Sequence, residues 1–425
     1  MLDVGGIGYT ASTWGYAQEA PTSTFLKKWD KYKLQPIVGF QVWTTYTTGT
    51  EVFNATTGQY DAVDNRLNTQ LRRSRFGIKG QPYPNLQFNV TAALDLVGQD
   101  VLTGVEAPGN NGGSPTFRVW NAYMTWKLTN KSEHFNLSFG YLLPQIGRES
   151  MTAALRSTSF EKAWSQNYLR RQLTGIGPGR AGGVNMGGIF RKTDANIGWG
   201  YDVGVFNPVF EMYNGNSTGN RFSPLVVGRF HVTYGDGESA KYSLGHKVNY
   251  HSQRKGITLG VVAAQQGATD LFYTNQAAGV DLLLNWKHLN IDGDWTVLQR
   301  QTADMSHRKV TSQTGYVRCS YNLHLANGYM LEPVAMWVQF SGEMDEEGQA
   351  AASAAGAFAG KDQTIDVGLN LYFNPDLKLS LHYSLRDGDA GFAGAGARVN
   401  NYFNQSGIGA IHRGDWAGLG LVSLF

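Results

Sequence analysis

The sequence predicts an all-β fold, a transmembrane antiparallel β-barrel of sixteen strands with long extracellular loops. Three observations favour this fold: segments in which apolar and polar residues alternate, connections that alternate between short and long, and an amphipathic final strand that ends in Phe425. Because only every second residue of such a strand faces lipid, the hydrophobic fraction of 42% is compatible with a membrane barrel. No run of about 18 apolar residues occurs, which excludes a helical membrane protein.

The alternation begins near residue 36 and recurs to the end of the chain. It is clearest over residues 86–96, where apolar residues alternate with Gln, Asn and Thr at the two-residue period of a half-buried strand. The sixteen candidate strands lie near residues 36–43, 71–80, 86–96, around Trp120 to Trp126, and near residues 135–141, 183–191, 197–206, 223–234, 256–266, 277–288, 291–301, 313–325, 329–340, 364–373, 377–386 and 415–425. No internal repeat of blade length is present, which argues against a soluble propeller.

The connections between these strands alternate in length. Short turns, such as residues 81–85, 326–328 and 374–376, alternate with long loops, as expected of a barrel with tight turns on one side of the membrane. The connection over residues 235–255 breaks this rule, because it is long where a short turn is expected. We expect it either to extend two strands beyond the membrane or to indicate a different strand count.

The chain divides into a leader and a barrel. Residues 1–35 have no sustained period and carry a lysine-rich patch, so we expect an N-terminal leader that is periplasmic or loosely docked, followed by the barrel over residues 36–425. The final strand, residues 416–425, resembles the C-terminal signal by which the assembly machinery of the outer membrane recognises bacterial barrels, although Ser423 departs from the usual apolar residue. That resemblance implies the bacterial outer membrane, and a signal peptide that the numbering does not include.

The composition excludes several kinds of site. A net charge of +3 is too small to indicate a nucleic-acid partner. Cys319 is the only cysteine, so the chain has no intramolecular disulfide and no cysteine-based metal cluster. The histidines are scattered without the spacing of a zinc site, and we expect no metal and no other cofactor.

The second candidate strand carries the strongest functional signal. At the two-residue period of a strand, Arg73, Arg75 and Lys79 share one face. The opposite face carries Phe76, and the same parity places Arg72 on the lipid side near the outer rim, where a long side chain reaches water. A strand with three cations on one face and apolar groups on the other fits a wall between lipid and an aqueous pore.

Further cations fall on inward faces by the same parity argument. They are Arg229, His231, Arg318, Lys378, His382 and Arg386. Placing an arginine or lysine toward lipid at mid-bilayer costs about 2–4 kcal/mol, so the reverse assignment is unfavourable. A column of cations in a narrow pore replaces part of the hydration of an anion and repels small cations. Asp95, Asp281 and Asp366 also fall on inward faces, which argues against a channel dedicated to phosphate.

These residues resemble a known family, the phosphate-selective porins O and P. The resemblance rests on Leu-Arg-Arg-Ser-Arg-Phe-Gly at residues 71–77, on Gly140 and Tyr141 with Pro144, and on Val-Gly-Arg-Phe at residues 227–230. It covers the whole barrel in outline, with specific motifs in the first half only. It implies a sixteen-stranded trimeric channel with a basic lumen. The lysine-rich binding zone of the family has no residue-by-residue counterpart in this sequence.

In porins the loop after the fifth strand folds into the barrel and narrows it, and residues 143–182 occupy that place by strand order. This segment is the candidate constriction loop. If it folds inward, its arginines line the constriction. They are Arg148, Arg156, Arg170, Arg171 and Arg180, and the segment has only Glu149 and Glu161 as acids. The alternative is a solvated external loop.

The sequence therefore predicts an outer-membrane porin for the passive diffusion of small hydrophilic solutes and ions, with a preference for anions that leaves phosphate specificity open. Its expected partners are outer-membrane lipid and lipopolysaccharide, small anions or polar solutes, and further copies in a homotrimer. One alternative is a structural or partner-binding barrel that uses its long loops or its leader. Another is a barrel enzyme that uses Asp387, Asp389, His412 and Asp415 near the outer ends of the last strands. No nucleophile motif accompanies these residues, so we expect no enzyme activity.

Overall fold

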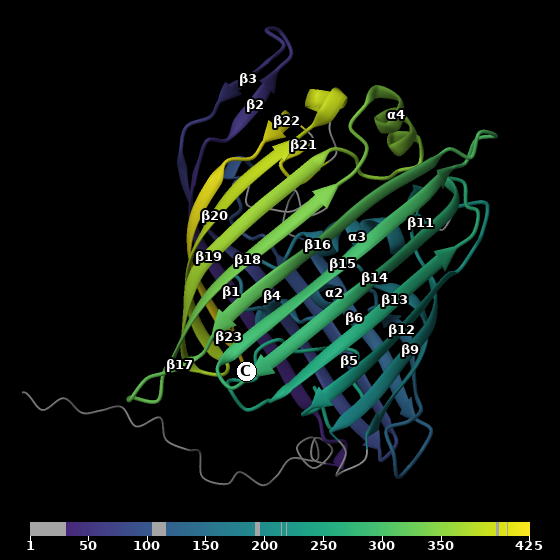
Figure 1. Ribbon diagram of the computed structural model, residues 1–425, viewed down its shortest axis with the longest axis vertical. Coiled ribbons are helices and arrows are strands. Elements are labelled where there is room, and N and C mark those ends of the chain that lie inside the picture. The colour runs from purple at the N-terminus through teal and green to yellow at the C-terminus, as the bar shows by residue number, and fades with distance from the viewer. Residues whose placement is uncertain are drawn as a thin grey trace, which may run out of the picture.

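The computed structural model describes residues 31–103, 116–191, 196–213, 215–217, 219–396, 399–405 and 407–425. These residues form one closed β-barrel whose strands are tilted (Figure 1). Most of the expected leader, residues 1–30, lies outside the described residues, so its role stays a prediction.

The barrel has sixteen antiparallel strands, which confirms the fold expected from the alternation. The strands are β1 (Gln35–Thr48), β4 (Arg66–Tyr83), β5 (Leu86–Asp95), β6 (Thr116–Lys127), β7 (Asn136–Leu142), β8 (Ala181–Arg191), β9 (Ile197–Asn207), β12 (Leu225–Gly235), β13 (Gly256–Gln266), β14 (Phe272–Trp286), β15 (Leu289–Thr302), β16 (Lys309–Tyr321), β18 (Met330–Ser341), β19 (Lys361–Asn374), β20 (Leu377–Asp389) and β23 (Asp415–Leu424). The short β17 (Leu323–His324) continues β16, and both pair with β18. Each barrel strand pairs with the next one, and β23 pairs with β1, which closes the sheet.

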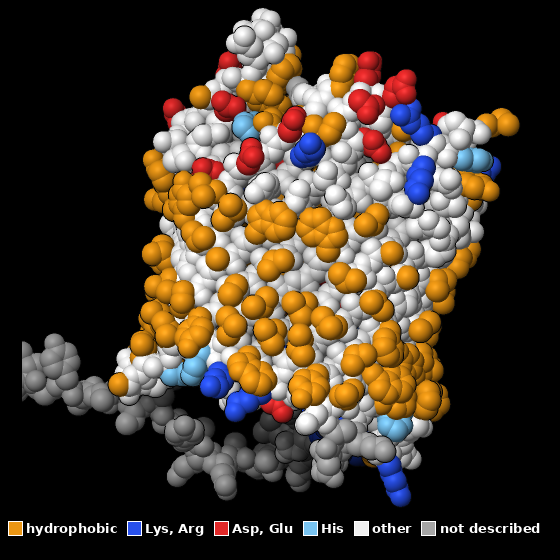
Figure 2. All heavy atoms as spheres, in the orientation of Figure 1, with side chains coloured by type: hydrophobic (Ala, Val, Ile, Leu, Met, Phe, Trp, Pro, Cys, Tyr) orange, Lys and Arg blue, Asp and Glu red, His pale blue; other side chains and the backbone are white. Residues whose placement is uncertain are grey.

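Apolar side chains cover the outside of the barrel at mid-height (Figure 2). On β13, for example, Leu259, Val261 and Ala263 point outward and are exposed, whereas the residues between them are buried. Alternate residues of a strand face opposite sides, so one pattern produces both the lipid-facing surface and the lumen wall. Trp126 and Trp286 lie at or next to the ends of their strands, where aromatic rings suit a membrane–water interface. Among the described residues, no helix is long and apolar enough to cross a membrane.

The two ends of the barrel differ. Short turns join strands at the end that holds the C-terminus, and we assign that end to the periplasm. At the outer end, β2 (Glu51–Asn54), β3 (Gln59–Ala62), β21 (Tyr402–Gln405) and β22 (Gly409–His412) pair in a small sheet above the barrel (Figure 1). The remaining outer elements are β10 (Glu211–Tyr213), β11 (Gly215–Ser217), α4 (Glu346–Ala354) and two 3-10 segments, Val101–Thr103 and Gly391–Gly396.

The prediction that Arg72 faces lipid is wrong. β1 and β4 pair with a register shift, because Gln41 opposes Arg73 whereas Val42 opposes Leu71, and this leaves Arg72 as an extra residue in β4. A β-bulge of this kind places two residues of one strand opposite one residue of its partner. Arg72 and Arg73 both point into the lumen as a result, and Arg72 is only 2% exposed. A strict period of two cannot reveal an inserted residue.

Residues 143–180, within the expected constriction loop, lie between β7 and β8 and fold into the barrel. This inward loop contains α2 (Arg148–Met151), a short 3-10 helix at Ala154–Arg156, and α3 (Ser165–Leu173). α2 and α3 contact β14, β15, β16 and β18 from inside, and Figure 1 shows both helices behind the front strands.

Wall residues satisfy the backbone of the inward loop. Gln41 on β1, Asn370 on β19 and Lys378 on β20 donate side-chain hydrogen bonds to carbonyl oxygens of residues 157–160, at 3.1, 2.6 and 2.7 Å. Buried carbonyl groups need such partners, because water does not reach them. The inward loop is thereby fixed to several separate strands.

The long connection over residues 236–255 also folds into the barrel, from the periplasmic end. It is not an extension of two strands, because β12 ends at Gly235 and β13 begins at Gly256, and these two residues pair directly. It does not change the strand count either, so both expectations for it were wrong. Leu244 and Val248 of this segment are buried among residues of the lumen. We call residues 236–255 the strap.

Candidate functional site: an arginine cluster in the lumen

The inward residues differ in exposure around the lumen. Almost all inward residues of β14, β16 and β19 are buried beneath the inward loop and the strap. On β5 and β6, by contrast, the inward residues Gln87, Asn89, Trp120 and Tyr123 keep at least partial exposure. The wall formed by β5 and β6 therefore keeps several inward residues within reach of solvent, whereas the arginines of β4 are buried.

On this wall, Trp120 lies between two guanidinium groups. The guanidinium carbon of Arg75 on β4 is 3.9 Å from the ring centroid, and that of Arg180 at the end of the inward loop is 4.0 Å from it. A cation over an aromatic face is attracted by the ring quadrupole. Trp120 thereby helps to hold two like charges close together, one from the wall and one from the inward loop.

Three arginines of β4 are neutralised by acids. Glu161 of the inward loop accepts from Arg72 at 2.8 Å and also pairs with Arg73. Arg75 pairs with Asp95 on β5 at 2.6 Å. Burial opposes the charge of Glu161, but Arg72 and Arg73 hold its pKa below the ordinary value, so the acid is ionised.

Arg170 and Arg180 differ from the arginines of β4 in their partners. Within the described part of the chain, neither Arg170 nor Arg180 is bonded to a carboxylate. Arg170 on α3 donates to Gln166 Oε1 at 3.2 Å. Arg180 donates to Asn121 Oδ1 at 3.3 Å and to Pro178 O at 2.8 Å. Neutral oxygens satisfy some of their N–H groups and do not neutralise either positive charge.

Neighbouring arginines add positive charge around Arg170 and Arg180. Burial, followed by Arg171 and Arg73, lowers the pKa of Arg170 to about 10. Burial, followed by Arg170 and Arg75, lowers the pKa of Arg180 well below its ordinary value. Burial disfavours a charge of either sign, but the repulsion from the neighbouring arginines becomes an attraction for a solute anion.

Two N–H donors of the cluster are buried without an acceptor. They are Arg75 Nη2 and Arg170 Nε. A buried donor without a partner costs about 1–3 kcal/mol, so an oxygen placed here is stabilised. Gly179 makes room for Arg170, because its φ of 77° suits glycine and a Cβ there would overlap the Arg170 side chain.

Other predicted cations bind the inward loop to the wall. Arg318 on β16 is fully buried and bonds Asp292 on β15 at 2.6 Å and Glu149 on α2 at 3.1 Å. Arg148 on α2 bonds Asp281 on β14 at 2.7 Å. Each of these cations therefore faces an acid.

The same network reaches the strap. Asp281 also accepts from Arg229 on β12 at 2.8 Å, and Arg148 bonds Glu238 of the strap at 2.8 Å. The anchor network consists of Arg148, Glu149, Arg229, Glu238, Asp281, Asp292 and Arg318. Three arginines against four acids do not make a source of positive potential. The structure thus separates the predicted basic residues into a charged cluster and a neutralised anchor.

Two histidines and a lysine lie inward beside this anchor. His231 Nδ1 is 3.1 Å from a guanidinium nitrogen of Arg229. His382 Nδ1 is 2.7 Å from Asp366 Oδ1, and Lys378 is bonded to the inward loop. His382 is bonded to an acid and Lys378 to the backbone of the inward loop, so neither belongs with the arginines beside Trp120.

The remaining predicted residues lie toward the ends of the pore. Lys79 is exposed near the periplasmic end of β4, and Arg386 donates to a backbone oxygen at 3.3 Å near the outer end of β20. Arg156 pairs with Asp376 at 2.6 Å on the periplasmic side. Arg171 is half-buried next to Arg170. We define the arginine cluster as Arg73, Arg75, Arg170, Arg171 and Arg180. These five arginines come together from β4 and from the inward loop, and their combined charge is positive.

Sequence reasoning missed the functional setting of Lys162 and Trp120. Lys162 Nζ donates to Thr152 O at 2.8 Å, and burial lowers the pKa of Lys162 to about 7, with Glu149 opposing the shift and Arg170 adding to it. The signal that could have found Lys162 is the arginine content of the inward loop. Neighbouring arginines disfavour the charged form of a lysine placed among them. No pattern places Trp120 between two arginines from distant segments.

Among the described residues, no hydrogen bond or ion pair joins the candidate catalytic residues to one another. His412 Nδ1 lies 2.9 Å from Glu51 in the outer sheet, and Asp415 accepts from the backbone N–H of Arg386 at 2.7 Å. Asp387 and Asp389 accept from backbone N–H groups close to them in sequence. Among the residues that the structure describes, no group of three or more His, Cys, Asp or Glu side chains could hold a metal ion.

Comparison with known proteins gives a family and a fold. A family model described as phosphate-selective porin O and P matches residues 46–391. The chain is similar to the anion-selective porin from Comamonas acidovorans, with a TM-score of 0.52, 12% identity, and coverage of 92% of this chain and 99% of that one. It is also similar to OmpF of Salmonella typhi in complex with daunomycin, with a TM-score of 0.53, 13% identity, and coverage of 93% and 98%. A search of curated proteins finds no match.

Proposed function

The chain belongs to the phosphate-selective porin O and P family of the bacterial outer membrane, and we propose that its pore conducts small anions in preference to cations. The observation that carries this proposal is the pair Arg170 and Arg180, two lumen cations with no carboxylate partner among the described residues. Around them, Arg75 and Arg170 each hold a buried N–H donor that lacks an acceptor. Charge-assisted hydrogen bonds from guanidinium groups suit the oxygen atoms of small oxyanions.

The preferred solutes are small anions in general rather than phosphate alone. Glu161 and Asp95 neutralise Arg73 and Arg75 within the cluster, so the positive charge along the path is limited. A weaker positive field favours the passage of an anion over its tight binding, because conduction requires binding that is weak enough for the ion to leave.

The surroundings of the pore are part of the proposal. The apolar belt fits outer-membrane lipid, and the ends of the barrel fit the polar head groups, including lipopolysaccharide on the outer side (Figure 2).

We propose a homotrimer, as the family resemblance implies. Sedimentation of the purified protein in detergent tests this assembly, and a monomer at working concentrations would contradict it.

The reversal potential of the purified porin in a planar bilayer tests the anion preference. With a gradient of KCl across the membrane, the sign of the zero-current potential reports which ion permeates better. We expect the sign of chloride selectivity. A potassium-selective sign would overturn the proposal.

The anion preference is expected to rise as the pH falls through about 7. Lys162 has a pKa of about 7 in the folded protein, so acidification adds one positive charge beside Arg170 and Arg180. The chloride-to-potassium permeability ratio should increase between about pH 8.5 and 6, and Lys162→Met should remove this increase. Lys309→Met, at an exposed lysine of the outer rim, is the matched control and should leave the pH dependence unchanged. An equal pH dependence in the Lys162 variant would exclude this residue as the titrating group.

A further inference from the structure

The strap crosses the periplasmic opening of the barrel. At one side, Tyr242 Oη donates to Asp202 on β9 at 2.5 Å and accepts from Asn185 on β8 at 2.8 Å. At the other side, Asn249 Nδ2 donates to Glu332 on β18 at 2.7 Å. The strap is therefore fixed at both sides of the lumen, to strands that are far apart around the barrel.

Between these two sides the strap lies against the inward loop. His246 N donates to Met151 O at 3.1 Å, and Gln145 Nε2 donates to Leu244 O at 3.1 Å. Glu238 of the strap also belongs to the anchor network, through Arg148 of the inward loop. The strap and the inward loop thus form one layer across the filled side of the lumen.

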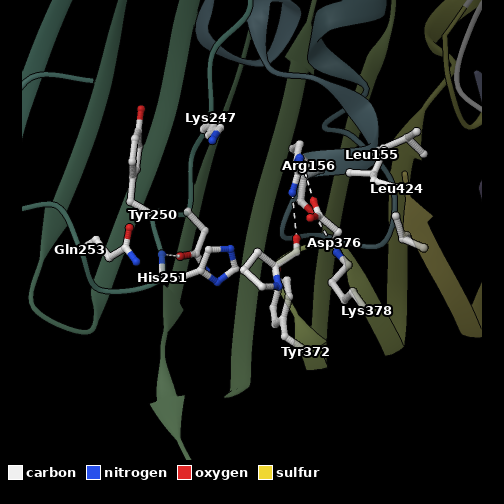
Figure 3. Close-up of a pocket in the computed structure, with 14 residues that line it drawn as sticks. Leu155, Arg156, Lys247, Tyr250, His251, Gln253, Tyr372, Asp376, Lys378 and Leu424 are labelled. Atoms are coloured by element: carbon white, nitrogen blue, oxygen red, sulfur yellow. Dashed lines mark hydrogen bonds and ion pairs between the residues drawn. The ribbon is translucent and has the colours of Figure 1, made fainter. Parts of the chain in front are cut away.

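A gap remains where the strap meets the opposite wall. A cavity of about 190 Å³ separates His251 and Lys247 of the strap from Lys378 and Leu424 of the wall, with Arg156 of the inward loop on a third side (Figure 3). The described residues of the strap make no hydrogen bond to β1, β20 or β23. The periplasmic opening is consequently narrowed to the side of the barrel that the strap leaves uncovered.

We propose that the strap is an exit filter, which sets the size limit of the pore while the arginine cluster sets its charge preference. Barrels of this class usually have short periplasmic turns, which leave the lumen beneath the inward loop open. Here a solute that has passed the arginine cluster leaves between the strap and the uncovered wall. This inference rests on the proposed conduction through the lumen.

The strand register allows the strap to be removed without changing the barrel. Gly235 and Gly256 are direct cross-strand partners at the ends of β12 and β13. A two-residue Asn-Gly turn joins such a pair in a hairpin, because its type I′ geometry matches the twist of the strands. A variant with Asn-Gly in place of residues 236–255 therefore keeps all sixteen strands.

The strapless variant is expected to have a single-channel conductance raised roughly twofold and to admit larger sugars in liposome swelling, because the exit is wider. Its chloride-to-potassium ratio should stay on the anion side, since the arginine cluster remains. Unchanged conductance and an unchanged sugar limit in a folded barrel would overturn the exit filter. If the parent protein carries no current at all, the proposed conduction fails instead.

A chemical test keeps the strap intact. It tests the exit filter even if the deletion variant does not fold. Lys247→Cys places a thiol in the cavity beside the exit, in a Cys319→Ser background that removes the exposed native thiol. Bulky methanethiosulfonate reagents added from the periplasmic side should lower the conductance, more so as the reagent grows. Lys361→Cys, at an exposed lysine of the outer end, is the control and should show no such loss. Full current after complete labelling at position 247 would place the cavity outside the conducting path.

Discussion

Replacing both Arg170 and Arg180 by glutamine is expected to lower the chloride-to-potassium permeability ratio by at least about tenfold. A unit charge about 8 Å from a permeating ion contributes about 2 kcal/mol at an effective dielectric constant near 20, and about 1.4 kcal/mol corresponds to a factor of ten. Salt screens this interaction over about 10 Å at 0.1 M, so the reversal potential should be measured at or below that concentration.

These two arginines are a better test than Arg73 and Arg75. Arg73 and Arg75 pair with Glu161 and Asp95, so their removal would leave buried carboxylates without partners. Arg170 and Arg180 bond to neutral oxygens, and glutamine retains a polar side chain with N–H donors. The barrel should therefore fold normally in the double variant.

The matched control removes the same charge from the outer surface. Arg221 and Arg308 are exposed on outer loops, and the side chain of Arg308 makes an exposed ion pair with Glu347 at 3.1 Å. Their double replacement by glutamine should leave the permeability ratio nearly unchanged, because solvent screens them. Equal ratios in the two double variants would show that the arginine cluster does not set the selectivity.

Arg318→Met is expected to destabilise the protein by about 3–5 kcal/mol, because it leaves two buried carboxylates without their cation. Arg318 is fully buried, and it bonds Glu149 and Asp292 while also donating to Ser157 and Ser159 of the inward loop. Methionine fills similar space and supplies no charge. Unfolding by guanidinium in detergent measures the change in free energy.

The same substitution should loosen the inward loop before it unfolds the barrel. Barrel closure depends on strand pairing, whereas Arg318 holds α2 to the wall. Single-channel recordings should therefore show added current noise at temperatures where the barrel is intact. Arg308→Met removes an arginine from an exposed pair, and its stability should change by less than about 1 kcal/mol. Equal effects of the two substitutions would contradict the anchoring role.

Most of the barrel could be predicted because a membrane wall imposes a period of two. Each strand must place apolar residues toward lipid and polar residues toward water, so residues such as Leu259 and Val261 define both the strand and its orientation. The parity argument also placed Arg229, Arg318 and Lys378 on the lumen face, where the structure has them. Parity failed at Arg72, because one inserted residue in β4 reverses the faces on either side of it.

The strap shows a second limit of sequence reasoning. The anomalous length of residues 236–255 was visible, but its path was not, since the residues that bind it belong to other strands. Asp202 and Glu332, for example, become its partners only when the barrel has closed. The length of a connection shows that extra residues must be placed somewhere in the fold, but it does not show where they lie.

The sequence by itself determined the barrel, its membrane, and the inward face of most cations, because these follow from local alternation. Only the tertiary structure decided which of those cations carry free charge. Arg318 meets Glu149 across 169 positions of sequence, and Arg148 meets Asp281 across 133, whereas Arg170 and Arg180 meet no described carboxylate. Charge compensation depends on distances of a few ångströms between segments that are remote in the chain, and residue types along one strand do not encode those distances.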